Sequence, residues 1–465
     1  MITRKVTRRE MLKLAGTAAV GTVLAACGAP AASPQAPAAT SAPAPTEVPP
    51  TQAPAAVTGP VTVSVMHDPK EFTEDMIKQF ESANATIKLE VIQTDMTRFY
   101  AMAAAGNPPD VVRVQAPDLP QMLARQLLLD LTPYFDTSAL LKLDDLAPAN
   151  NYYKAEGPTQ FGSGSIYGMV KDGSPDFTLF IYTVAFEEAK VPVPDVTKSF
   201  TYDELADLGK KLTKVQGDKS LRWGFDMSDG WIDRIWMNML AETGQSLYTS
   251  DYMKINLVKN DEARKAAQYF FDLQKANAMA SPVNPSPNWI GDDFNKGLVG
   301  IIQYGYWFSA MAESDVTKGK TVMLPSPTWA GKRRDPTMTA TGTIISSKTK
   351  NPDDAWKVFE WYHGGAPSVE RAKGGWGVPG LKSQYPMMPT DTPFQKQARA
   401  VLEAELPYTN DVLQFNPFIS GDTVFNLWNK YVEQALRGSL SFDDMLTKIE
   451  AEVNMALQEG ADRIG

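Results

Sequence analysis

One stretch of the chain alternates between two hydrophobic periods, and this alternation constrains the fold more than any other feature of the sequence. Apolar residues recur at every second position in 61–65 and 87–91, which is the period of a strand, and an apolar run follows at 111–114. A helical face is predicted over about 71–82, and a second helix ends at the Gly-Asn-Pro-Pro of 106–109. Strands that alternate with helices predict a mostly parallel sheet with helices on both faces.

Length and composition narrow the class of protein. The 465 residues exceed the roughly 250–300 at which a single hydrophobic core stops growing, so at least two lobes are expected. Lysine and arginine number 45 against 54 aspartate and glutamate, and no basic block lies outside the first residues, which argues against nucleic-acid binding. One cysteine and two histidines exclude an internal disulfide and a Cys/His metal cluster, and neither a metal nor a cofactor is expected.

The N-terminus has the pattern of an export signal followed by a lipid attachment site. A basic start precedes an apolar run from Leu14 to Ala26, which is shorter than the ~20 residues that span a bilayer, so residues 1–26 are predicted to be a signal peptide. The segment from Thr7 to Lys13 resembles a twin-arginine motif, and both the twin-arginine and the general secretory routes stay open. The segment from Leu24 to Cys27 resembles a bacterial lipobox, and Cys27 is therefore expected to carry a lipid that anchors the exported chain at the extracytoplasmic face of the membrane.

Residues 27–59 are predicted to be a tether. They are mainly Ala, Pro, Ser and Thr with one charged residue, Glu47, and their prolines remove hydrogen bonds that a helix or a sheet would need. No large apolar residues repeat in this segment, so it cannot build a core. The lipid anchor is expected to be the only contact with the membrane.

Polar residues follow two of the predicted strands. His67 and Asp68 follow the first strand, and Asp118 follows the strand at 111–114. Open α/β sheets bind ligands beyond the carboxyl ends of their strands, so these residues are the first candidates for a binding site. The alternatives are a solvated turn for His67 and Asp68 and a helix N-cap for Asp118.

Several short segments resemble, in order, the extracellular solute-binding proteins of ABC importers, in the carbohydrate-binding group that includes maltose-binding protein. They span nearly all of residues 60–465, and their order behind an export signal makes the resemblance specific. The segments are Ala104–Val112, Leu127–Leu131, Ser165–Met169, Phe180–Tyr182, Phe200–Leu205, Asp293–Ile301, Tyr304–Trp307, Gly342–Ser346, Lys350–Phe359 and Gly377–Gly380.

The resemblance implies a two-lobe clamp of the periplasmic-binding-protein type. This is an α/β fold in which each lobe is a mostly parallel sheet flanked by helices, and crossover strands act as hinges. Lobe I would comprise 60–172 and 340–381, and lobe II would comprise 173–339 and 382–465. The resemblance further implies a monomer that is not an enzyme. Its lobes are expected to close on a small solute, expected to be a carbohydrate, which the protein delivers to the permease subunits of an importer.

The resemblance also implies which side chains contact the ligand. Asp229 and Trp231 lie where the family has an acidic and aromatic cleft loop, and Trp307 lies at a family tryptophan. Tyr304 and Tyr306 replace an asparagine and a small residue of the family pattern, which adds aromatic surface. For each aromatic residue, packing in the core is the alternative. The predicted ligand-binding residues are His67, Asp68, Asp118, Asp229, Trp231, Tyr304, Tyr306, Trp307, Trp376 and Phe425.

Two other functions stay open. A non-sugar solute such as glycerol phosphate, a polyamine or a sugar acid would suit the same fold; cleft Arg or Lys would favour an anion, and a carboxylate-rich aromatic box an amine. An extracytoplasmic glycosidase would need two carboxylates that face each other across a cleft, whereas the acid pairs of this sequence lie mostly at helix starts, as at Asp353 and Asp354. His363 precedes two glycines at a predicted helix end, where a charged imidazole would favour the helix dipole.

Overall fold

The computed structural model describes residues 59–217, 219–227 and 229–464. The chain separates into residues 1–57 and 58–465, and the elements below belong to the second part. The predicted signal peptide, Cys27 and the tether as far as residue 58 lie outside the described residues. Of the helices that the structure describes, none is long and apolar enough to cross a membrane.

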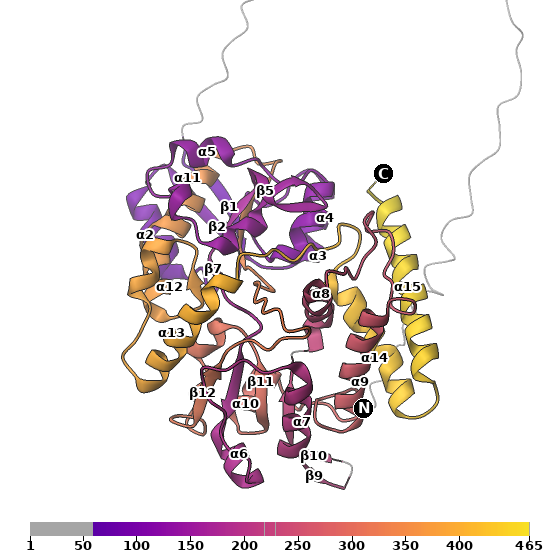
Figure 1. The fold of residues 1–465 in the computed structure, drawn as a ribbon. Helices are drawn as coiled ribbons and strands as arrows, with labels where there is room; N and C mark the ends of the chain where they lie inside the picture. The colour runs from indigo at the N-terminus through magenta and orange to yellow at the C-terminus, as the bar shows by residue number, and fades with distance from the viewer. Residues whose placement is uncertain (1–58, 218, 228, 465) are drawn as a thin grey trace, which may run out of the picture. The chain divides into compact units, whose positions relative to one another are not determined.

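The first five-stranded sheet has the order β2-β1-β3-β13-β6 (Figure 1). Its strands are β1 (Val61–His67), β2 (Ile87–Gln93), β3 (Val111–Val114), β6 (Gly168–Val170) and β13 (Gly342–Ile345), and nearby helices are α2 (Glu74–Ala83), α3 (Met96–Ala104), α4 (Leu119–Ala124), α5 (Thr132–Thr137), α11 (Pro352–Gly364) and α12 (Ala366–Gly374). Val65 of β1 shares a core with Phe80 of α2 and Phe359 of α11. Its neighbour Met66 belongs to another core, which includes Phe99 of α3. Because successive side chains of a strand point to opposite faces, helices cover both faces of this sheet.

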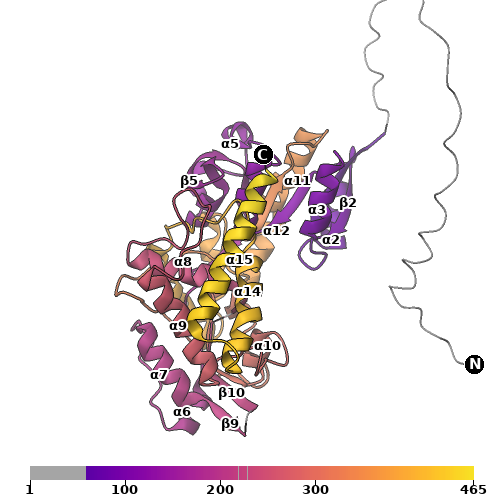
Figure 2. The same ribbon diagram turned by 90° about the vertical axis from the view of Figure 1, so that its right-hand side faces the viewer.

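The second five-stranded sheet has the order β12-β8-β11-β10-β9. Its strands are β8 (Leu179–Tyr182), β9 (Lys214–Gln216), β10 (Lys219–Asp226), β11 (Val299–Gln303) and β12 (Thr321–Leu324). The helices of this part are α6 (Thr183–Ala189), α7 (Tyr202–Leu212), α8 (Ile232–Glu242), α9 (Asp261–Lys275), α10 (Ile290–Asn295), α13 (Pro393–Glu405), α14 (Gly421–Leu436) and α15 (Phe442–Asp462). Helices α14 and α15 lie side by side (Figure 2). The fully buried rings of Trp236 and Trp428, with centres 5.4 Å apart, pack α8 against α14.

The predicted starts of two helices are confirmed. The hydroxyl of Thr201 accepts the N–H of Glu204 at 3.2 Å, and the Glu204 carboxylate accepts the N–H of Thr201 at 2.7 Å, which is the capping box expected for α7. Helix α15 begins after Ser441, whose hydroxyl accepts the N–H of Asp444 at 3.0 Å. The predicted inward residues of α15 are all buried: Leu446, Ile449, Val453 and Leu457.

Most strands of each sheet run in one direction, as predicted, and the other strands run against them. In the first sheet β1 runs parallel to β2 and β3, but β13 is antiparallel to both β3 and β6. In the second sheet, only β10 and β11 form a parallel pair among the described strands. The chain reaches β8 from the first sheet and β13 from the second sheet. Each of these two strands runs antiparallel to both of its neighbours. The α/β arrangement of sheets flanked by helices is confirmed.

Three connections pass between the two sheets, after β6, after β12 and after β14 (Val378–Pro379). β14 pairs antiparallel with β7 (Asp172–Gly173) on the first connection. The first two connections also bond to each other, because Asp335 accepts the N–H of Phe177 at 2.7 Å and Asp176 accepts the N–H of Met338 at 2.6 Å. The predicted lobe boundaries, after residues 172, 339 and 381, fall in these connections, and the division into lobes at those residues stays a prediction.

Asp176 makes the stability of the fold depend on pH. Burial raises the pKa of its carboxyl group to about 7, although the N–H groups of Met338 and Thr339 and the charge of Arg234 lower it. A carboxyl group whose pKa is higher in the folded state stabilises the fold below the unfolded pKa of about 4, and this contribution is lost as the pH rises to 7. In the wild type, Asp176 lowers the unfolding free energy by up to about 1.4 kcal/mol for each pH unit between pH 4 and 7. We expect Asp176→Asn to lack this contribution, so that its unfolding free energy, measured by urea denaturation, falls less steeply over this range. Equal slopes in the variant and the wild type would contradict the raised pKa.

Candidate functional site

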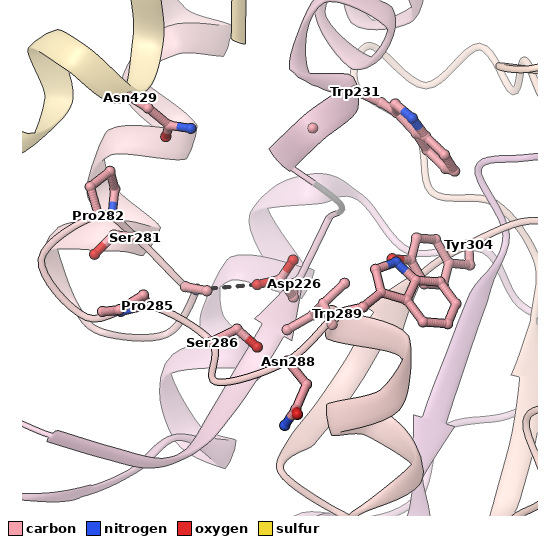
Figure 3. A pocket seen from close by; sticks show the side chains of 13 residues that line it. Asp226, Trp231, Ser281, Pro282, Pro285, Ser286, Asn288, Trp289, Tyr304 and Asn429 are labelled. Atoms are coloured by element: carbon pink, nitrogen blue, oxygen red, sulfur yellow. Dashed lines mark hydrogen bonds between the residues drawn. The ribbon is translucent and has the colours of Figure 1, made fainter. Parts of the chain in front are cut away.

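A cavity of about 530 Å³ lies at the carboxyl ends of β10 and β11, which are parallel neighbours in the second sheet (Figure 3). Asp226 is the last residue of β10, and Tyr304 directly follows β11. Open α/β sheets bind ligands at this edge, and small-molecule sites have volumes of roughly 300–1,000 Å³. The cavity is lined by Asp226, Gly230, Trp231, Ala280, Ser281, Pro282, Pro285, Ser286, Asn288, Trp289, Ile290, Tyr304 and Asn429.

One side of the cavity is aromatic. The ring of Trp289 stacks on the rings of Tyr304 and Trp307, with centres 5.7 and 6.2 Å apart and interplanar angles of 21° and 25°. Trp231 meets Tyr304 at 5.9 Å and 55°. We call Trp231, Trp289, Tyr304 and Trp307 the aromatic wall. Trp289 is 45% exposed, so part of the wall offers a flat apolar face to a ligand.

Polar groups lie across the cavity from the aromatic wall. Figure 3 shows Ser281 and Asn429 opposite Trp231, with Asp226 between them. Asp226 is buried, and its carboxylate accepts the N–H of Ala280 at 3.1 Å. Within the described part of the chain, the side-chain oxygen of Asn429 is buried without a hydrogen-bond partner, so it can accept one from a ligand. In the same part of the chain, no three His, Cys, Asp or Glu side chains are grouped so that they could hold a metal ion.

The loop before α10 places Trp289 at the cavity. The fully buried carboxylate of Asp293 accepts hydrogen bonds from the side-chain amide of Asn288, at 2.7 Å, and from the hydroxyl of Ser286. Both of these residues line the cavity beside Trp289. The loop is also rich in proline, which restricts its backbone. Its shape, and with it the position of Trp289, is therefore fixed by its own hydrogen bonds.

Two charged residues from different sheets approach each other beside the cavity. Asp118 follows β3 of the first sheet, whereas Arg234 lies in the first turn of α8. The guanidinium carbon of Arg234 is 5.5 Å from the centre of the Trp231 ring. Burial raises the pKa of Asp118, while the N–H of Gln115 and the charge of Arg234 lower it, so the two charges are close enough to interact.

Some of the predicted site residues come together at this cavity. Trp231 and Tyr304 line it, and Trp307 packs against both rings. Asp118 interacts with Arg234, which lies beside Trp231. Its carboxylate accepts the N–H of Gln115 at 3.0 Å, which caps the 3-10 helix before α4, but it makes no side-chain hydrogen bond as the N-cap of α4, which was the alternative. Asp229 begins the short 3-10 helix that carries Trp231, and its side chain lies outside the described part of the chain.

His67 and Asp68 lie elsewhere. His67 is fully buried between the rings of Phe72 and Tyr362, and burial lowers its pKa to about 3. The backbone oxygen of Asp68 accepts the N–H groups of Glu71 and Phe72, which closes a turn after β1. The turn given as the alternative is present, but His67 is buried in it and not solvated, and neither residue lines the cavity.

Tyr306, Trp376 and Phe425 do not line the cavity either. Tyr306 is buried, which raises the pKa of its hydroxyl, and the charge of Arg399 on α13 opposes that rise. Trp376 is half exposed between α12 and β14. Phe425 of α14 is partly buried against the larger core. Ligand contacts of these three residues stay predictions.

The sequence-based reasoning missed Asp226, Trp289 and Asn429. Asp226 ends a strand in the same way as His67 and directly precedes a turn, so the rule of strand ends could have found it. Trp289 is a tryptophan in a proline-rich loop, where no helical stripe accounts for it. Asn429 lies on α14, and no local pattern marks it, because the fold alone brings this helix to β10 and β11.

Comparisons with known proteins agree with this fold. A family model described as bacterial extracellular solute-binding protein matches residues 64–363. An ABC substrate-binding protein from Listeria monocytogenes, in complex with cycloalternan, aligns with a TM-score of 0.70 at 20% identity, over 86% of this chain and 99% of that chain. The sugar-binding protein MalE from Xanthomonas citri aligns with a TM-score of 0.65 at 18% identity, over 86% and 98%.

A third solved structure is an ABC transporter solute-binding protein from Thermotoga lettingae bound with α-D-tagatose. It aligns with a TM-score of 0.65 at 19% identity, over 86% of this chain and 100% of that chain. A search of curated proteins gave no match. These likenesses confirm the predicted two-lobe α/β fold.

Proposed function

Because the chain belongs to the family of bacterial extracellular solute-binding proteins, we propose that it captures a mono- or oligosaccharide in the cavity beside the aromatic wall. In this proposal the chain delivers the sugar to the permease subunits of an ABC importer without changing it chemically. The division of the cavity into an aromatic side and a hydrogen-bonding side carries the proposal.

A sugar ring needs both sides of such a cavity. Its C–H faces are apolar and flat enough to lie on an aromatic ring, as on Trp231 or Trp289. Its rim consists of hydroxyl groups, and each one that is buried without a partner costs about 1–3 kcal/mol. The polar groups of Asp226, Ser281 and Asn429 lie where they can replace the water that these hydroxyls lose.

Solved structures with this fold are described with sugars of several sizes. Besides the cycloalternan and tagatose complexes, these include maltose bound to a Thermotoga maritima MalE and mannotriose bound to another binding protein. The identities lie below 25%, so the fold supports a sugar as the class of ligand and leaves the individual sugar open.

We propose that the two lobes close on the sugar by bending at the three connections. A ligand that contacts both lobes binds the closed state in preference and shifts the population towards it. A Kd near 1 μM corresponds to about −8 kcal/mol, which the contacts must supply beyond the free energy of closure. Arg234 lies beside Trp231 and interacts with Asp118, which belongs to the other predicted lobe, so one ligand can contact both of them.

We further propose that the chain is exported and held at the membrane by a lipid on Cys27. Its lipobox-like sequence supports this, although the residue lies outside the described part. We expect Cys27→Ser to abolish the incorporation of labelled palmitate and to move the protein from the detergent phase to the aqueous phase in Triton X-114 partition. Equal partition of variant and wild type would contradict the anchor.

The class of ligand is tested by a thermal-shift screen with sugars, glycerol phosphate, spermidine and glucuronate. A ligand at 100 times its Kd stabilises the folded protein by about 2.7 kcal/mol, which is readily measured. We expect a neutral sugar to raise the melting temperature. A shift with only the phosphate ester or the amine would contradict the sugar assignment, and cleavage of an offered glycan would indicate a glycosidase.

For the sugar found in that screen, we expect Trp307→Ala to weaken binding at least tenfold, measured by calorimetry. The ring of Trp307 packs against those of Trp231, Trp289 and Tyr304, so its removal takes away a packing partner of all three. Trp361→Ala is the matched control, because it removes a partly buried tryptophan from the core of the first sheet. Unchanged affinity in Trp307→Ala, with the fold verified by circular dichroism, would show that the aromatic wall does not contribute to sugar binding.

A further inference from the structure

Arg234 is a buried cation, and two of its three guanidinium nitrogens have no hydrogen-bond partner among the described residues. It is only 6% exposed, and among the described residues neither Nε nor Nη1 has a hydrogen-bond partner. Arg333 and Arg334, in contrast, form ion pairs with Glu405 and Asp411. Because buried donors without partners cost free energy, a guanidinium held in this way points to a partner from outside the chain.

The position of Arg234 is suited to a ligand in the cavity. Its guanidinium carbon lies 5.5 Å from the centre of the Trp231 ring, which lines the cavity, and 6.0 Å from that of Phe415. Its charge also lowers the pKa of Asp118, which comes from the first sheet. Pro117, which precedes Asp118, lines a small cavity together with Phe415, so this part of the first sheet also lies near the guanidinium.

The charges around Arg234 indicate which ligands fit. Burial and the charge of Asp422 raise the pKa values of both Asp118 and Asp233, and Asp226 adds a further carboxylate to the cavity. Several carboxyl groups thus lie around this guanidinium, and those that are ionised would repel an anionic ligand. A neutral polyol fits both kinds of group, because its hydroxyls accept hydrogen bonds from a guanidinium and donate them to a carboxylate.

We propose that Arg234 is a specificity-determining residue that donates hydrogen bonds to the oxygens of a neutral sugar, while Asp118 of the other lobe accepts one from a hydroxyl of the same sugar. This role rests on the sugar-binding function proposed above, and it adds that the site selects uncharged over acidic sugars. Because Arg234 and Asp118 belong to different lobes, a sugar that binds both of them holds the lobes together.

Calorimetry on the purified protein tests this role, with maltotriose, mannotriose and xylotriose as neutral probes and trigalacturonate as the acidic probe. We expect the wild type to bind at least one neutral trisaccharide and to bind trigalacturonate at least tenfold more weakly. For the neutral sugar, Arg234→Met should weaken binding at least tenfold, and Arg234→Lys should restore part of the loss because it returns the charge and a donor.

A stability measurement separates ligand contact from a structural role. Without ligand, Arg234→Met should melt close to the temperature of the wild type, because the loss of its interaction with Asp118 and Asp176 is offset by the removal of buried donors that lack partners among the described residues. A structural role would lower the melting temperature instead. Arg437→Met is the matched control, since Arg437 is 60% exposed and pairs with Glu433 on the outside of α14.

Each other outcome overturns a defined part of the account. If a neutral sugar binds Arg234→Met as tightly as the wild type, the role of Arg234 is wrong and the sugar-binding function stands. If trigalacturonate binds the wild type more tightly than every neutral probe, the selection for uncharged sugars is wrong. If the wild type binds none of these sugars and none in the thermal-shift screen, the proposed function fails, and the role of Arg234 fails with it.

Discussion

A polar solute that leaves water must exchange every hydrogen bond to water for one to the protein, and this requirement shapes the cavity at β10 and β11. The aromatic wall can cover the apolar faces of a sugar, but it cannot replace the water around the rim. In the proposed complex, the hydrogen bonds to the hydroxyl rim of the sugar come from Asp226 at the end of β10, Ser281 in a loop and Asn429 on α14. These groups are far apart in the sequence, so the packing of α8 and α14 around the second sheet is what makes a binding site of them.

The aromatic wall is also bonded to a connection between the lobes. The backbone N–H of Trp307 donates to the hydroxyl of Ser174 at 3.2 Å, and the backbone oxygen of Tyr304 accepts a hydrogen bond from the hydroxyl of Thr178 at 2.7 Å. Gly305 lies between these two residues, where any Cβ would collide with the Asp176 carboxylate. A ligand that lies against the aromatic wall is therefore only a few bonds from the segment that bends in the proposed closure of the lobes. This continuity gives a physical path by which occupation of the cavity can bias lobe closure.

The parts of the fold that depend only on residues close together in the sequence could be predicted from it. The capping box at Thr201 follows from a local rule, and the segment lies as that rule requires. The expectation for Trp231 rests instead on the family resemblance, and its ring lines the cavity. His67 and His363 show the limit of such rules, because each lies at the end of an element but is fully buried by distant residues. His363 shares a hydrogen bond with the Thr343 hydroxyl at 2.6 Å, and burial lowers its pKa well below the usual value, so the prediction of a charged cap was wrong. Arg234 could not be found in the sequence at all, since only tertiary packing buries its guanidinium and leaves Nε and Nη1 without partners among the described residues.

The central claim is that a sugar ring lies against the aromatic wall and is held by polar groups from both lobes. A crystal structure of the protein with the sugar that gives the largest thermal shift tests this claim most directly. The account predicts a ring in contact with Trp231 or Trp289, hydrogen-bonded on its rim to residues that belong to both sheets. A sugar bound on the outer surface, or held by one lobe with the aromatic wall unoccupied, would contradict it.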